Sequence, residues 1–309
     1  MRCSRFFAPR IFAVCCLAPW WIDAAAIAGE AVSLQRTLES SGSRVVPLRR
    51  TEDNHLYLTG RVNGRRSSIL VDTGTPFTAI STNMARSTER DCTIAQLTLG
   101  DITLTNQPAL VQDIRYDGQT APFDIVLGVD FLRRHAAIID CGKRRLYLPS
   151  QSADLTTQPA IVSILHQAGF TSLELASKHP PALTCGARVN GQPVELLVDS
   201  GAALSCLDTR QIERLGLKPK PTLRTIVGAD NVGKRAIIAA QAHRFTLGDT
   251  TMRDVKFAVL DLKDWGLAAP GESLGEVHGI LGGGELATLN AVIDCGSLKL
   301  WLKSPGQKR

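Results

Sequence analysis

The sequence predicts an all-β protein made of two tandem halves that share one fold. The main observation is a long repeat, in which Leu70-Val71-Asp72-Thr73-Gly74 returns as Leu197-Val198-Asp199-Ser200-Gly201 at a shift of 199 − 72 = 127 positions. In addition, each copy holds an Asn-Gly pair between two extended runs, which is the strongest short-range signal of a β-hairpin. With 309 residues, 44% of them hydrophobic, the chain can bury one large core or two modest ones.

The repeat extends well beyond the two acidic loops. The later matches, in the same order, are Thr98-Leu99-Gly100-Asp101 with Thr246-Leu247-Gly248-Asp249, Val126-Leu127-Gly128 with Ile280-Leu281-Gly282, and Ile139-Asp140-Cys141-Gly142 with Ile293-Asp294-Cys295-Gly296. The shift grows from 127 to 148 and then to 154, which places about 21 extra residues after Asp199 and about six more before Gly282. Insertions between matched strands usually lie in loops on a common scaffold.

The elements of the first half, residues 45–149, follow from local patterns. Strands are expected over residues 45–48, 56–62, 68–71, 94–99, 102–111 and 125–127, with a hairpin turn at Asn63-Gly64. We expect Asp130 to cap a short helix over residues 131–137, and residues 138–140 and 145–148 to form a closing hairpin. The second half, residues 171–309, repeats the first hairpin around Asn190-Gly191. Residues 29–44 are interpreted as a polar lead-in and residues 150–170 as a linker.

The insertion in the second half has the pattern of a projecting β-hairpin. Apolar runs flank a polar tip bounded by glycines, which comprises Val227, Gly228, Ala229, Asp230, Asn231, Val232 and Gly233. The first half has no room for a comparable segment between Ala79 and Ile94.

The N-terminal residues 1–28 read as a cleaved export signal. Arg2, Arg5 and Arg10 form a basic start, an apolar run follows, and Ala26-Ile27-Ala28 is a small-x-small cleavage site. The alternative is an uncleaved anchor, but the apolar run is shorter than the roughly 20 residues that a spanning helix needs. We therefore expect an exported protein, periplasmic or secreted, with no stable membrane anchor after cleavage. The absence of an Asn-x-Ser/Thr sequon favours a bacterial envelope.

Composition argues against nucleic acid, metals and cofactors. The formal net charge is +6, but the basic residues are scattered in pairs too short to grip phosphates. Cysteines with zinc-finger spacing are absent, and the histidines show neither triad nor metal spacing. Each histidine is interpreted as a surface or structural residue: His55, His135, His166, His179, His243 and His278. We expect no metal site and no cofactor.

Five cysteines remain after the signal: Cys92, Cys141, Cys185, Cys206 and Cys295. In an oxidising compartment up to two disulfides could form, and their connectivity cannot be read from the sequence. Cys141 and Cys295 occupy equivalent positions of the repeat. This leaves two interpretations open, a disulfide between them or a small residue tolerated in both turns.

Two apolar residues followed by Asp-Thr/Ser-Gly, and later an apolar pair before glycine, resemble the retropepsin-like aspartic protease superfamily. The resemblance covers roughly residues 45–149 and 171–303. It implies two tandem barrels forming a pepsin-like, pseudo-twofold bilobal unit, with Asp72 and Asp199 as the catalytic pair. It also implies that Thr73 and Ser200 lock the two loops together, that the insertion from Val227 to Gly233 is a flap over substrate, and that the loops at Leu127-Gly128 and Leu281-Gly282 support the site.

Two carboxyl groups at hydrogen-bond distance share one proton and titrate as a pair, so that one acts as a base toward water and the other as an acid toward a carbonyl oxygen. Gly74 and Gly201 permit the tight turns. The predicted function is therefore an aspartic endopeptidase that cleaves exported or envelope proteins. The alternative is a non-catalytic module that holds an extended peptide on a protease-like fold.

We expect the active unit to be a monomer in which both aspartates come from one chain. The two halves have diverged, and only the second carries a flap-length insertion, so pairing within a chain gives one dyad with one flap. The rival arrangement is a homodimer with two sites.

Overall fold

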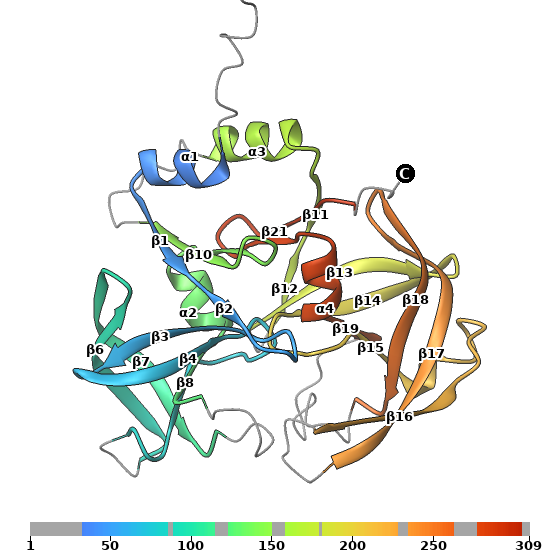
Figure 1. The fold of residues 1–309 in the computed structure, drawn as a ribbon, viewed down its shortest axis with the longest axis horizontal. Helices are drawn as coiled ribbons and strands as arrows, with labels where there is room; N and C mark the ends of the chain where they lie inside the picture. Colours follow the sequence, from blue (N-terminus) through green and yellow to red (C-terminus); the bar gives the residue numbers. More distant parts are fainter. Residues whose placement is uncertain are drawn as a thin grey trace, which may run out of the picture. The chain divides into compact units, whose positions relative to one another are not determined.

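The computed structural model describes residues 33–85, 89–114, 123–149, 158–178, 181–227, 234–262 and 277–304. All of them belong to one compact unit, Ser33–Arg309. Most of these residues form β-strands, which are arranged in two closed barrels and a third sheet (Figure 1). The all-β prediction with two tandem barrels is confirmed.

The first barrel is a closed sheet of six strands. Its order is β3 (Leu56–Val62), β4 (Arg65–Val71), β8 (Ile125–Leu127), β5 (Ala79–Ser81), β7 (Ile102–Gln112) and β6 (Asp91–Leu99), and pairing of β3 with β6 closes it. The short β2 (Arg49–Arg50) adds to β3. Asn63 and Gly64 have φ angles of 49° and 81°, so the β3–β4 turn has the left-handed backbone that this pair favours.

The second barrel repeats this order. It runs β13 (Ala182–Val189), β14 (Gln192–Asp199), β19 (Gly279–Gly282), β15 (Cys206–Asp208), β18 (Thr250–Leu260) and β17 (Lys234–Leu247), and β13 pairs with β17 to close it. A short 3₁₀ helix, Thr209–Gln211, follows β15, and β12 (Ala176–Lys178) adds to β13.

The insertion in the second barrel forms the expected hairpin. Strand β16 (Lys220–Val227) pairs with β17, and Val227 lies opposite Lys234. The predicted flap tip, residues 228–233, lies outside the described residues, so its placement stays a prediction.

A third sheet joins the two halves of the chain. It has the order β1 (Ser43–Pro47), β10 (Arg145–Pro149), β9 (Ile138–Asp140), β20 (Val292–Asp294), β21 (Lys299–Leu302) and β11 (Thr171–Glu174). The hairpin β9–β10 was predicted, but its pairing with the equivalent hairpin of the second half was not. In the central pair, Ile139 lies opposite Ile293, which are the same position of the repeat.

Helices cover one face of this sheet, and the sequence interpretation missed them. Helix α1 (Leu34–Ser40) lies in the expected lead-in and α3 (Gln158–Gln167) in the expected linker, side by side in Figure 1. Leu38, Ile161 and Leu165 pack with Tyr147 and Trp301 of the sheet in one buried cluster. These helices are held by an apolar face rather than by strong local propensity.

Each barrel also carries one short helix directly after its last strand, α2 (Val129–Arg134) and α4 (Gly283–Thr288). The prediction that Asp130 is the N-cap of the first of these is wrong. The helix begins two residues earlier, at Val129, with Gly128 as N-cap, and the Asp130 carboxylate instead accepts hydrogen bonds from Thr78.

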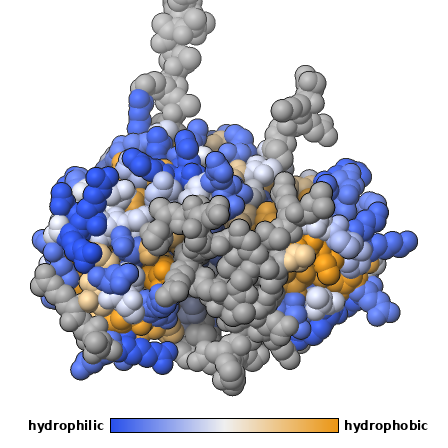
Figure 2. All heavy atoms as spheres, turned by 60° about the horizontal axis from the view of Figure 1, so that its bottom comes forward, coloured by the Kyte–Doolittle hydropathy of each residue, from blue (hydrophilic) through white to orange (hydrophobic). Residues whose placement is uncertain are grey.

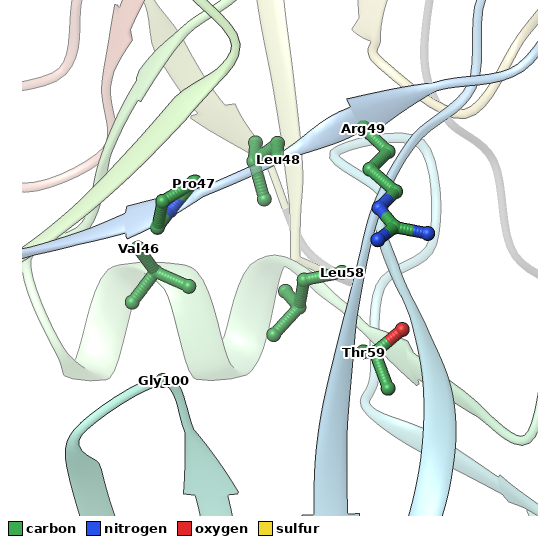
Figure 3. Close-up of a pocket in the computed structure, with 7 residues that line it drawn as sticks. All are labelled: Val46, Pro47, Leu48, Arg49, Leu58, Thr59 and Gly100. Carbon is green, nitrogen blue, oxygen red and sulfur yellow. The ribbon is translucent and has the colours of Figure 1, made fainter.

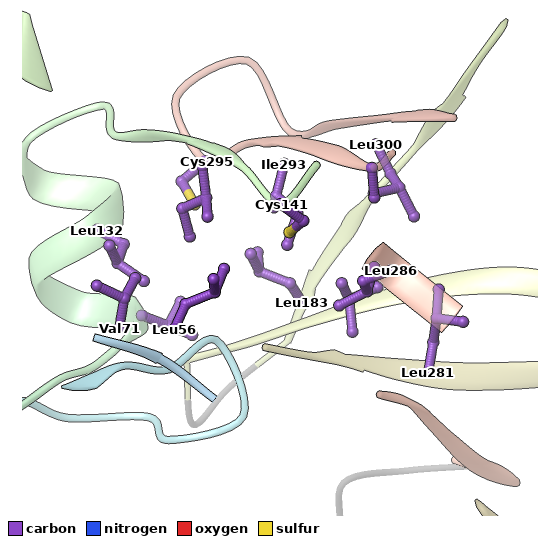
Figure 4. Close-up of a cluster of buried hydrophobic side chains, with 14 of the residues drawn as sticks. Leu56, Val71, Leu132, Cys141, Leu183, Leu281, Leu286, Ile293, Cys295 and Leu300 are labelled. Carbon is purple, nitrogen blue, oxygen red and sulfur yellow. The ribbon is translucent and has the colours of Figure 1, made fainter. Parts of the chain in front are cut away.

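The main hydrophobic core runs continuously through both barrels and the joining sheet. Figure 4 shows Leu56, Val71 and Leu132 of the first half together with side chains of the second half. Cys141 and Cys295 both point into this core.

All five described cysteines are free, and four of them are buried. The backbone N–H of Cys141 binds Ala291 O, whereas that of Cys295 binds Ala137 O, so the two thiols lie at separate points along the β9–β20 pair. Cys141 and Cys295 therefore form no disulfide with each other, which favours the interpretation that both turns tolerate a small residue. Burial raises the pKa of Cys141 to about 12, which disfavours its thiolate.

Figure 3 shows a surface hollow of about 250 Å³ beside β1 and β3. Its walls comprise Val46, Pro47, Leu48, Arg49, Leu58, Thr59 and Gly100, and neither repeated aspartate reaches it. None of the helices in the described part of the chain is long and apolar enough to cross a membrane.

Candidate active site

The two aspartate loops occupy equivalent strand ends in the two barrels. Asp72 follows β4, whose parallel partner is β8, and its backbone N–H donates to Leu127 O at 3.1 Å. Asp199 ends β14, opposite Gly282 of the parallel strand β19. Each aspartate is thus held at the buried end of a paired strand, which is a rigid place for a functional side chain.

The structure brings the two carboxyl groups into contact. A Cβ atom built on Gly74 would collide with the Asp199 carboxyl group, and one built on Gly201 would collide with that of Asp72. Only glycine leaves room for a carboxyl group from the opposite loop at these positions. Asp72 and Asp199 are 5% and 7% exposed, so the pair is largely withdrawn from water but still reachable.

Threonine and serine hydroxyls interlock the two loops. The Thr73 N–H donates to Ser200 Oγ at 3.1 Å, and the Ser200 N–H donates to Thr73 Oγ1 at 2.9 Å. Each hydroxyl then donates to a carbonyl of the other half, Thr73 to Val198 O at 2.7 Å and Ser200 to Val71 O at 2.9 Å. These four buried bonds form a reciprocal bridge, which we call the interlock, and they fix the distance between the two aspartates.

The hydrogen bonds to the two carboxyl groups differ. Asp72 accepts the Gly74 N–H on Oδ1 at 2.8 Å and the Thr75 hydroxyl on Oδ2 at 2.7 Å. Asp199 accepts two backbone N–H groups on Oδ1, from Gly201 at 2.8 Å and Ala202 at 2.9 Å. The first loop therefore offers a hydroxyl donor that the second loop lacks.

The pKa of Asp199 is raised well above the usual carboxyl range. Burial contributes most, followed by the charge of Asp72 and a side-chain hydrogen bond with Asp72, and the two backbone donors only partly offset them. The raised pKa of Asp199 beside a second carboxyl group is the behaviour expected of a pair that shares one proton.

Two acidic residues support the loops behind the dyad, in a role that the sequence interpretation did not assign to either of them. Thr78 Oγ1 donates to Asp130 Oδ1 at 2.8 Å and accepts the Gly128 N–H at 3.3 Å. In the second barrel, the Ser205 hydroxyl bonds to Glu285 and accepts the Gly282 N–H at 2.9 Å. The signal was present in the sequence, because Thr78 and Ser205 are related by the same shift of 127 as the aspartates.

A turn of the first half reaches over to the second half beside the dyad. The Arg50 guanidinium donates to Cys141 O at 2.6 Å, to Asn54 O at 3.1 Å and to Gly283 O at 3.5 Å. Asn54, at a φ of 68°, donates through its amide to Ala203 O at 3.4 Å. These contacts fix the turn of residues 51–55 against the loop that follows Asp199.

Of the predicted site residues, the structure brings together both aspartates, Thr73, Gly74, Ser200, Gly201 and the two apolar-glycine loops. Val227 ends β16, and the other flap residues lie in the segment that the structure does not describe. Within the described ranges, no group of three or more His, Cys, Asp or Glu side chains could hold a metal ion.

A comparison with protein families matches residues 186–284 to the family described as aspartyl protease. This stretch resembles aspartyl proteases in sequence. It contains the second aspartate loop, the flap hairpin and Gly282. Among curated proteins, no relative matches.

Solved structures of aspartic proteases also match. The aspartic proteinase of Irpex lacteus is 14% identical, with a TM-score of 0.49 over 86% of this chain and 98% of that chain. The retropepsin-like aspartic protease of Rickettsia conorii is 19% identical, with a TM-score of 0.29 over 44% of this chain and 90% of that chain. The family match and the paired barrels agree with the retropepsin-like resemblance and with a protease function.

Proposed function

We propose that this chain is an aspartic endopeptidase in which Asp72 and Asp199 activate a water molecule to hydrolyse peptide bonds of exported or envelope proteins. The main support for this proposal is that the two carboxyl groups contact each other and that the interlock holds their loops together. A purely structural aspartate at a strand end has no need of a second one facing it.

The asymmetry of the pair assigns the roles. Asp72, whose carboxylate accepts the Thr75 hydroxyl, acts as the base and takes a proton from the attacking water. Asp199, which retains the shared proton, donates it to the carbonyl oxygen of the scissile bond. The resulting tetrahedral diol collapses when the proton on Asp72 passes to the departing nitrogen and the C–N bond breaks. As the carbonyl group re-forms, one diol hydroxyl gives its proton to Asp199, and the pair returns to its starting state.

The surface near the site suits an extended, partly apolar peptide. Phe77, shortly after the first aspartate loop, is 43% exposed, and Ile238, on the hairpin strand β17, is 45% exposed. Figure 2 shows apolar atoms gathered in patches on the face that it brings forward. Contiguous exposed apolar patches commonly mark binding surfaces.

The test is cleavage of denatured proteins and apolar peptides by the purified protein, produced from the full chain, between acidic and neutral pH. We expect cleavage that a statine-type transition-state mimic inhibits and that chelators or serine reagents leave unchanged.

Asp72→Asn and Asp199→Asn each should abolish cleavage without loss of fold, because the mechanism needs two carboxyl groups with one proton. Asp101→Asn is the matched control, since that carboxylate only forms an exposed ion pair with Arg44. A folded protein that binds peptides and never cleaves them would instead support the non-catalytic module. An aspartate variant with near-normal turnover would show that Asp72 and Asp199 are not the catalytic pair.

A further inference from the structure

The strand register places His55 beside Asp72. Strands β3 and β4 are antiparallel, with Tyr57 opposite Leu70 and Leu58 opposite Ile69. Continuing this register by two residues brings His55 level with Asp72, on the sheet face that Tyr57 and Leu70 share. The sequence interpretation had treated His55 as a surface or structural residue.

The imidazole is held in this place by an aromatic wall and by the docked turn. The His55 ring lies edge-on to Phe123, with 6.3 Å between ring centroids, and Phe123 also contacts Tyr57 at 5.7 Å. The backbone N–H of His55 donates to Thr51 Oγ1 at 3.0 Å. The preceding residue, Asn54, anchors the turn to the second half of the chain, as described above.

The second half has no equivalent group. The shift of 127 that relates the aspartates relates His55 to Ala182, which is 3% exposed and packs in an aliphatic cluster with Leu197 and Ile280. The register there is the same, since Thr184 lies opposite Leu197 and Ala182 is level with Asp199. An imidazole therefore faces only the first aspartate of the pair.

Building on the proposed function, we propose that His55 is a positioning residue of the dyad, whose imidazolium stabilises the ionised Asp72 carboxylate and so extends activity toward acidic pH. A cation beside a carboxylate favours its charged form. Together with the Thr75 hydroxyl, His55 biases the single negative charge of the pair toward Asp72, and Asp199 keeps the proton.

The groups around His55 set the pH at which it acts. Burial lowers its pKa, while the carboxylates of Asp72 on β4 and Asp53 in its own turn raise it in part. Phe123 and Tyr57 contribute uncharged faces, and the Arg50 guanidinium donates to the carbonyl oxygen of the adjacent Asn54 and to those of Cys141 and Gly283. The imidazolium consequently forms on the acidic side of the usual histidine range.

The kinetic test compares three variants over a full pH profile. His55→Gln should move the acidic limb of kcat/KM upward by about one pH unit, because Asp72 loses its neighbouring cation. His55→Arg should keep the limb near its original position, since it restores a positive charge. His243→Gln is the control, as that side chain is 88% exposed, and it should leave the profile unchanged. A His55→Gln enzyme with an altered KM and an unmoved acidic limb would overturn the proposal.

A second measurement does not depend on hydrolysis. We expect the pKa of His55, followed by NMR of its imidazole, to fall in Asp72→Asn relative to the wild type and to stay unchanged in Asp101→Asn. Equal values in wild type and Asp72→Asn would overturn the pairing, even if the enzyme cleaves. If the wild type cleaves nothing but the shift is observed, the pairing holds and the proposed function fails. This test also decides the matter if His55→Gln does not fold.

Discussion

The two aspartate loops have the same backbone design and different polar surroundings. In both, a backbone N–H two residues onward binds the carboxylate, and a hydroxyl of one loop binds the backbone of the other. Around Asp72 there are also the Thr75 hydroxyl and the His55 ring, where the second half has Ala202 and Ala182. The repeat thus fixes where the carboxyl groups lie, and its divergence gives the two carboxyl groups different neighbours.

The two barrels also differ in the side chains that cluster near each aspartate loop. Phe123, Tyr57 and Leu70 form an aromatic cluster on the first barrel. At the matching place in the second barrel, Val277 and Leu197 form an aliphatic cluster, beside the inserted hairpin β16–β17. A dyad assembled from two identical halves would have the same surroundings on both sides. These differences therefore support our proposal that an active dyad requires one copy of each half.

The largest expected effect tests that requirement. Asp72→Asn and Asp199→Asn proteins each lack one carboxyl group, and we expect a mixture of the two to remain inactive, because each dyad draws both aspartates from a single chain. The measurement is peptide cleavage by the mixture after prolonged incubation.

Mixing wild type with an excess of Asp72→Asn is the control for subunit exchange. It should leave the activity per wild-type molecule unchanged. Recovery of activity in the mixture of the two variants would show that dyads form between molecules, and the monomer proposal would then be wrong.

We expect the Thr73 and Ser200 hydroxyls of the interlock to contribute equally to the stability of the fold, although the two side chains differ. Ser200→Ala leaves the Thr73 N–H and Val71 O buried without a partner, and Thr73→Val does the same to the Ser200 N–H and Val198 O. Each lost partner costs about 1–3 kcal/mol, so we expect either variant to lower the free energy of unfolding by about 2–6 kcal/mol.

Urea unfolding at constant m-value measures this loss. Thr98→Val, whose hydroxyl contacts only the exposed Thr103 at 3.3 Å, serves as control and should change stability by less than about 0.5 kcal/mol. If only one interlock variant lowers the free energy of unfolding more than the control does, the two hydroxyls do not contribute equally to stability.

A smaller effect concerns the hydroxyl that only the first loop carries. Because the Thr75 hydroxyl donates to Asp72, it stabilises the ionised carboxylate, so Thr75→Val should raise the acidic limb of the activity profile by about one pH unit. Ala202→Thr supplies a matching donor to Asp199 and should lower the alkaline limb instead. An unmoved acidic limb in Thr75→Val would mean that this hydrogen bond does not distinguish the two aspartates.

The site could be read from the sequence because its parts are duplicated at one spacing. Asp72 and Asp199, their glycines and the bridging hydroxyls lie on strands whose hairpin turns are also duplicated, so a single repeat predicts both the barrels and the dyad. Asp130 was misread because an aspartate before an apolar run satisfies the rule for a helix N-cap. Its actual partner, Thr78, is distant in sequence, and local patterns do not report such bonds.

The joining sheet and its helices could not be predicted in this way. Pairing of Ile139 with Ile293 is a long-range contact between two short strands, each of which already forms a plausible local hairpin. Helices α1 and α3 are short and contain few charged residues, and they are stabilised mainly by packing on Tyr147 and Trp301. His55 was missed because its role depends on the register of β3 against β4 and not on any motif.

The last comparison is between the two aspartates as contributors to stability. The pKa of Asp199 is raised in the folded state. The stability that the folded protein gains from keeping this carboxyl group protonated is therefore fully present below the usual carboxyl pKa of 3.8. This stability is lost as the pH rises through the folded pKa. Asp199→Asn stays neutral at every pH and escapes this loss, at about 1.4 kcal/mol per pKa unit. We therefore expect Asp199→Asn to be more stable than wild type at neutral pH by at least about 1 kcal/mol, and the difference to shrink toward pH 3.

In Asp72→Asn, Asp199 keeps its burial but loses the neighbouring charge, so this variant should retain part of the wild-type pH dependence. Urea unfolding at several pH values measures both variants, with Asp101→Asn as control for a carboxylate on the surface. If Asp199→Asn is no more stable than Asp101→Asn at neutral pH, then Asp199 is not the member of the pair that holds the proton, and the assignment of acid and base must be reversed.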